Sequence, residues 1–119
     1  MYAGPERRKH ARISGRFIVS YRILQEEDNV DVTQTKNLSL GGMLLTTNRS
    51  FDAGTNLAIE IRLPFDPNPI MLIANVIDSR EISKDLIYDT RLRFLAIDER
   101  HRNVILQTVN YYCKKDNQS

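Results

Sequence analysis

The chain has 119 residues, a length that suits one domain with a single modest core. Its 41% hydrophobic and 27% charged residues are typical of a globular protein, and no apolar run is long enough to insert in a membrane as a helix. The one cysteine, Cys113, excludes an internal disulfide and favours a reducing, cytoplasmic compartment.

The net charge of +2 is unevenly distributed along the chain. Residues 1–16 contain five arginines and lysines against Glu6 alone, which gives +4 there and leaves −2 for the rest. We expect residues 1–14 to form a flexible basic arm without the apolar stretch of a secretory signal. Such an arm favours an anionic partner, namely a phosphate, a nucleic acid or a membrane surface, although a solvated leader that aids solubility explains the charge equally well.

After the arm, short segments with strand composition alternate with turns. The expected strands cover residues 15–24, 30–39, 42–47, 57–63, 70–82 and 86–97. Polar residues, glycines or prolines separate most of them, and three prolines within 64–69 mark a clear turn. Strands that follow one another without helices favour antiparallel pairing, and a small sheet removes its exposed edges by closing. We therefore predict a mainly β fold, a six-stranded antiparallel barrel over residues 15–97.

The last segment changes to a helical period. Asp98 is a plausible N-cap for a helix over residues 98–115, followed by a polar tail over 116–119. The apolar positions of this helix fall on or beside one stripe: Val104, Ile105, Leu106, Thr108, Val109 and Tyr112. We expect this C-terminal helix to cover an open end of the barrel or to pack on its outside.

Residues that could support catalysis are not arranged in a recognised pattern. His10 and His101 are far apart in the sequence, and Cys113 is explained more simply as a packed or surface residue than as a nucleophile. The acidic run over residues 26–28 lies in an expected turn, where solvation explains it better than metal binding does. We expect no enzyme activity, no metal and no cofactor.

The stretch RKHAR, residues 8–12, places two arginines four positions apart within the basic arm. In an extended or a helical arm, the Arg8 and Arg12 side chains can point towards one surface. A guanidinium pairs bidentately with phosphate oxygens and with the O6/N7 edge of guanine, and it stacks on base faces. These two arginines are therefore suited to hold a guanine nucleotide.

The stretch NLSLGG, residues 37–42, places Asn37 and Ser39 on one face of a strand, with Leu38 and Leu40 directed to the core. The two glycines that follow interrupt the strand, permit a positive φ and allow a ligand to approach the backbone. An Asn-Ser turn with a glycine bulge is the alternative interpretation.

Taken together, RxxxR followed by NxSxxG resembles the signature of the PilZ domain, a bacterial module that binds the second messenger cyclic di-GMP. The strand pattern and RLRFLAID before the helix are also similar to that family. The resemblance implies a ligand site at Arg7, Arg8, Arg12, Asn37, Ser39, Gly41 and Gly42. It implies that Arg8 and Arg12 bind guanine and phosphate, Asn37 bonds the guanine edge, and Ser39 bonds a phosphate or nearby backbone. Asn37 replaces the commoner Asp of the motif.

By this resemblance, the chain is a single-domain receptor whose ligand is cyclic di-GMP and whose downstream partner is an effector protein. We expect a monomer or a weak homodimer without membrane insertion. An adaptor for protein interactions with an idle nucleotide site is the alternative function. A small barrel that binds RNA or DNA polymers is disfavoured, because the strands do not interleave exposed aromatic and basic residues.

Overall fold

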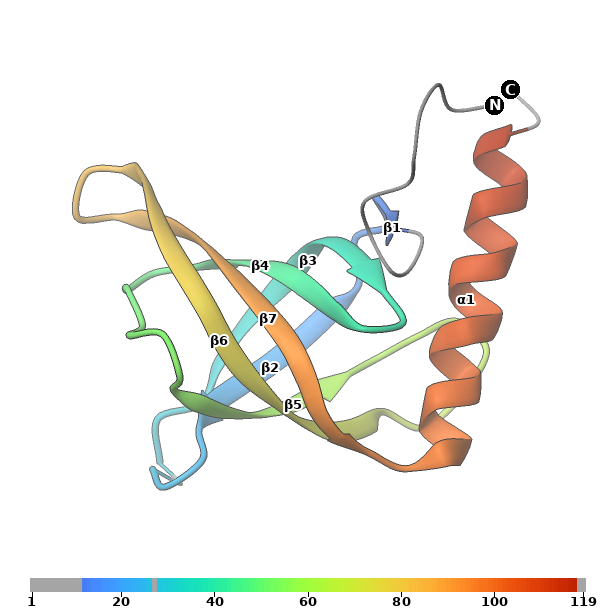
Figure 1. The fold of residues 1–119 in the computed structure, drawn as a ribbon, viewed down its shortest axis with the longest axis horizontal. Coiled ribbons are helices and arrows are strands. Elements are labelled where there is room, and N and C mark those ends of the chain that lie inside the picture. The colour runs from blue at the N-terminus through green and yellow to red at the C-terminus, as the bar shows by residue number, and fades with distance from the viewer. Residues whose placement is uncertain (1–11, 27, 118–119) are drawn as a thin grey trace.

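The computed structural model describes residues 12–26 and 28–117 as strands followed by one helix (Figure 1). The elements are β1 (Arg12–Ile13), β2 (Ile18–Ile23), β3 (Asp31–Ser39), β4 (Gly42–Thr47), β5 (Asn56–Ile61), β6 (Ile70–Ser83), β7 (Ile87–Ile97) and α1 (Glu99–Asn117). The six longer strands coincide with the six expected segments to within a few residues at each end.

Strands β2 to β7 close into an antiparallel barrel. Their order is β3-β2-β5-β6-β7-β4, and a further pairing of β3 with β4 joins the two edges. The predicted six-stranded antiparallel barrel with a C-terminal helix is thus confirmed. The short β1 is an addition, because Arg12 and Ile13 of the expected arm pair with β3. Residues 1–11 of that arm lie outside the described residues.

The core fills the inside of the barrel with the apolar residues of each alternating strand. On β5, Leu57, Ile59 and Ile61 are buried, whereas Ala58 and Glu60 between them are only half-buried. The β6–β7 hairpin extends beyond the barrel on the side away from α1 (Figure 1). Its turn places Asp85 at a φ of 59°, a conformation that Asp tolerates better than most side chains.

Helix α1 stands beside one end of the barrel, close to β1 and β3 (Figure 1). The Asp98 carboxylate accepts the Arg100 N–H at 2.8 Å, which confirms the predicted N-cap. The stripe is buried at Val104, Ile105, Thr108 and Val109, but Leu106 is exposed, so its assignment to the stripe was wrong. Leu106 lies about 100° around the helix from Ile105, on the side opposite to Val104, and there it leaves the packed face.

A buried threonine fastens the segment before β2 to the barrel. Thr35 on β3 accepts the Phe17 N–H at 3.0 Å and donates its hydroxyl to the Gly15 carbonyl at 2.7 Å. The Phe17 ring packs edge-to-face on Tyr112 of α1, with ring centroids 5.6 Å apart. Strand β3, the segment that follows β1 and helix α1 therefore form one packed unit.

We expect Thr35→Val to destabilise the protein by about 1–3 kcal/mol, because it leaves the buried Phe17 N–H and the partly buried Gly15 carbonyl without their partner. The matched control is Thr33→Val on the same strand, where a half-buried hydroxyl donates to the Thr46 carbonyl at 2.8 Å. Water can replace that bond, so its loss should cost less than about 1 kcal/mol. Urea unfolding of both variants measures the difference, and equal losses would contradict this role of Thr35.

Candidate functional site

The candidate site lies where β1, β3 and β4 meet. Strand β1 pairs with the end of β3, so that Arg12 lies opposite Ser39 and Ile13 lies opposite Leu38. Directly opposed residues of an antiparallel pair project to the same face. Ile13 and Leu38 are buried in the core, so Arg12 and Ser39 are on the outer face. Arg12 of the first motif and Ser39 of the second are thereby side by side in the fold.

A β-bulge decides which face Asn37 occupies. Thr35 pairs with Leu45 and Asn37 pairs with Leu44, so two residue steps on β3 match one on β4. Strict alternation would direct both Thr35 and Asn37 inward. The bulge instead allows both Thr35 and Leu38 to be buried and puts the half-buried Asn37 on the same face as Ser39.

Ser39 organises the turn that follows β3. Its Oγ accepts the N–H groups of Gly41 at 3.3 Å and Gly42 at 3.2 Å, and it donates to the Gly42 carbonyl at 3.2 Å. The side chain is only 8% exposed. On the face that Asn37 and Ser39 share, Asn37 is half-buried and Ser39 is buried, because the Ser39 hydroxyl is engaged by nearby backbone.

Gly42 is required by a close approach of two strands. It pairs with Arg93 on β7, and a Cβ atom built on it would overlap the Leu92 carbonyl oxygen. The Phe94 N–H donates to the Gly41 carbonyl at 2.9 Å, which ties the same turn to β7. Positive φ is not the reason for these glycines, since Gly54 is the one described glycine with a positive φ. The pairing of Gly42 with Arg93 and the Phe94 hydrogen bond thus hold the turn after Ser39 against β7.

The structure adds a cation that sequence analysis did not select. Arg93 is exposed and lies opposite Gly42, which has no side chain to cover that part of the outer face. Arg12 on β1 therefore lies at the end of the turn where Ser39 is, and Arg93 on β7 lies at the end where Gly42 is. The sequence did contain a signal for Arg93: the alternation in RLRF, residues 91–94, directs Arg91 and Arg93 outward.

Arg7 and Arg8 lie outside the described residues. Within residues 12–26 and 28–117, no three histidine, cysteine, aspartate or glutamate side chains gather closely enough to hold a metal ion. In the same part of the chain, no helix has both the length and the apolarity needed to cross a membrane. The chemistry available at the site is that of guanidinium, amide and backbone N–H groups.

A model of the PilZ domain family matches residues 6–111, which include both motifs and most of the chain. The chain belongs to the PilZ domain family. This PilZ domain has no match among curated protein sequences.

Several solved structures have the same fold. Bacillus subtilis MotI/DgrA, an inhibitor of motility, has a TM-score of 0.77 and 20% identity, covering 97% of this chain and 54% of that one. The PilZ domain of Escherichia coli YcgR, solved with c-di-GMP, has a TM-score of 0.69 and 17% identity, covering 95% of this chain and 96% of that one. The K. pneumonia MrkH–c-di-GMP complex has a TM-score of 0.75 and 16% identity, covering 96% of this chain and 56% of that one. This PilZ domain thus spans about half the length of MotI and of MrkH, and likeness at such identities shows the fold.

Proposed function

We propose that this PilZ domain is a receptor for cyclic di-GMP and acts without catalysis. The observation that carries the proposal is the pairing of β1 with β3, which puts Arg12, the last residue of the first motif, directly opposite Ser39 of the second. YcgR and MrkH, which share the fold, were both solved with this ligand. A cytoplasmic second messenger also suits a chain with a single cysteine.

The charges and shape of the site fit a cyclic dinucleotide with two phosphates. Arg12 is exposed next to the turn, and its guanidinium can pair with a phosphate or with a guanine edge. Asn37 is half-buried on the same face and offers an amide that both donates and accepts hydrogen bonds. Ser39 and Gly42 hold the turn between them, so the ligand would meet a preformed surface.

The arginine arm would supply the rest of the clamp. Residues 1–16 carry a net charge of +4, which attracts a dianionic ligand. In this proposal Arg7 and Arg8 close over the nucleotide as the arm becomes ordered, which is a switch that needs no chemical step. The ordered arm would then offer a downstream effector protein a surface that the free receptor lacks.

Amide mapping by NMR during a titration with cyclic di-GMP tests where the ligand binds. We expect the largest shift changes at Arg12, Asn37, Gly41 and Gly42. The Lys84 amide, in the turn of the β6–β7 hairpin, should remain unchanged. Shifts confined to another surface would contradict the proposed site.

We expect Asn37→Asp to strengthen binding by up to about tenfold. A carboxylate accepts from both N1–H and N2–H of guanine, and charge-assisted hydrogen bonds are about twice as strong as neutral ones. Calorimetric titration of the variant and the parent measures the change. Weaker binding by the Asp variant would show that Asn37 does not accept from the guanine edge.

A further inference from the structure

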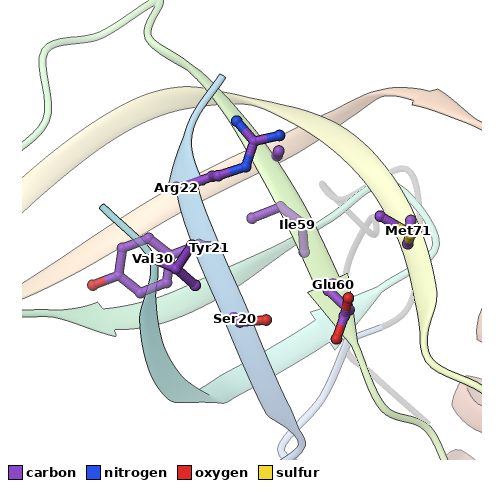
Figure 2. Close-up of a pocket in the computed structure, with 8 residues that line it drawn as sticks. Ser20, Tyr21, Arg22, Val30, Ile59, Glu60 and Met71 are labelled. Carbon is purple, nitrogen blue, oxygen red and sulfur yellow. The ribbon is translucent and has the colours of Figure 1, made fainter. Parts of the chain in front are cut away.

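A shallow groove crosses the outer face of the barrel and does not include the described residues of the ligand site. It spans β2, β5, β6 and β7 and has a volume of about 670 Å³. Figure 2 shows the part of this face where Arg22, Glu60 and Met71 project from β2, β5 and β6. The neighbouring residues Tyr21 and Ile59 are buried in the barrel core.

The groove has a floor of small residues and two apolar walls. Ala58 lies between Arg22 and Ile73 in the strand register, and Ala96 lies beyond Ile73. Met71 is 64% exposed and Leu95 is 51% exposed. Ile73 pairs with Ala96 and the next residue, Ala74, pairs with Phe94. Leu95 therefore has no partner on β6 and projects at a bulge. Large apolar side chains gathered on one exposed face indicate an interaction surface.

The two ends of the groove carry opposite charges. Arg22 lines the β2 end, where its Nη1 donates to the Leu24 carbonyl at 2.9 Å and orients the guanidinium. Asp98 lines the β7 end, and its cap to Arg100 uses one of several acceptor positions of the carboxylate. Glu60 lies directly opposite Met71, and both residues line an adjoining smaller depression that Arg22 also lines. When a two-fold axis relates two such grooves, the cation at one end of each groove lies against the anion at the other end of its partner, so the surface is complementary to itself.

We propose that a second copy of this chain occupies the groove, forming a symmetric homodimer. Met71 and Leu95 of each protomer pack against the apolar floor of the other. Arg22 of each protomer pairs with Asp98 of its partner, once at each end of the interface. The groove has one cation and one anion at its ends, with Glu60 as the further charge opposite Met71, and this small net charge favours a second copy over a strongly charged partner protein. The proposal does not depend on the ligand site, which lies on β1, β3 and β4 and on Arg93 of β7, because the groove uses the part of β7 from Leu95 onwards.

Sedimentation velocity over a range of protein concentrations tests the proposal without any ligand. The wild-type chain should shift from monomer to dimer as the concentration rises, and Met71→Asp should abolish the shift. The matched control is Leu86→Asp, because Leu86 is 65% exposed but lies at the β6–β7 hairpin turn, outside the groove. A wild-type chain that stays monomeric at every concentration overturns the proposal and leaves the groove to another protein. A dimer that Leu86→Asp disrupts and Met71→Asp does not also overturns it.

A charge exchange tests the two-fold pairing itself. Arg22→Asp gives like charges at both ends of its own dimer, and so does Asp98→Arg, so neither variant should dimerise alone. Mixed in equal amounts, they should form a heterodimer in which both ends are again complementary. Thermal unfolding checks that Asp98→Arg still folds, and Asp98→Asn, which keeps a capping side chain, should weaken the dimer in any case. Failure of the mixture to associate, with both variants folded, overturns the pairing.

Discussion

An Arg12→Ala variant should bind cyclic di-GMP roughly 10- to 150-fold more weakly than the wild-type chain, which corresponds to about 1.5–3 kcal/mol for a charged hydrogen-bonding group. Arg12 is the one arginine of the motif that the described residues place at the site, opposite Ser39 and next to the turn. Its side chain is exposed, so its removal should leave the free energy of unfolding nearly unchanged. The loss would therefore be a loss of ligand contact.

Arg62→Ala is the matched control for Arg12→Ala. Arg62 is also exposed and carries the same charge, but it follows β5, and its backbone N–H donates to the Ile18 carbonyl at 3.1 Å. If the ligand responded only to net charge, both variants would lose affinity to a similar extent. Calorimetry on the two variants at one salt concentration separates these cases. An Arg12→Ala variant with wild-type affinity would show that the arm does not hold the nucleotide.

Gly42→Ala should destabilise the protein by about 3 kcal/mol or more, the upper end of what overpacking costs. The added methyl group would overlap the Leu92 carbonyl oxygen, and that oxygen belongs to the backbone of β7, which cannot rotate away as a side chain can. Either β4 and β7 separate or the turn after Ser39 changes shape. Both outcomes should also abolish binding of cyclic di-GMP.

Gly54→Ala provides the comparison for Gly42→Ala. Gly54 has a φ of 92°, but an added Cβ would meet no atom within 4 Å. Its cost should be backbone strain of about 1–2 kcal/mol, with binding of the ligand unchanged. Urea unfolding and a ligand titration of both variants measure the two effects. A Gly42→Ala variant that is as stable as the parent would contradict the close approach of β4 to β7.

The sequence predicted best those elements whose pattern is local. Residues 42–47 became β4 with the expected bounds, and the alternation over residues 57–63 gave β5, which ends at Ile61. The helix began after Asp98 because a side-chain cap depends only on neighbouring residues. Leu106 was assigned wrongly, since an apolar residue beside a stripe does not have to be part of it.

Features that depend on distant parts of the chain were not predicted. Strand β1 has two residues and no pattern of its own, and it exists because β3 offers an edge to pair with. Val32 is exposed although it is apolar, while Thr35 is buried because Phe17 and Gly15 supply its hydrogen-bond partners. Hydrophobicity along β3 is therefore a poor guide to its faces.

The residues of the candidate site stay a prediction, and the sequence predicted only part of their geometry. The spacing of Asn37 and Ser39 gave a common face, but the engagement of the Ser39 hydroxyl by the turn depends on the folded backbone. Arg93 was missed because its position next to Gly42 follows from the register of β4 and β7, which a single sequence does not encode locally.

Isothermal titration of the wild-type chain with cyclic di-GMP is the most direct test that this PilZ domain is a receptor. We expect a saturable heat of binding with a defined stoichiometry and a dissociation constant of tens of micromolar or tighter. GMP, which has a guanine base but only one phosphate, should bind much more weakly, because it cannot engage the arm and the turn together. The absence of saturable binding of cyclic di-GMP at tens of micromolar would contradict the proposed function.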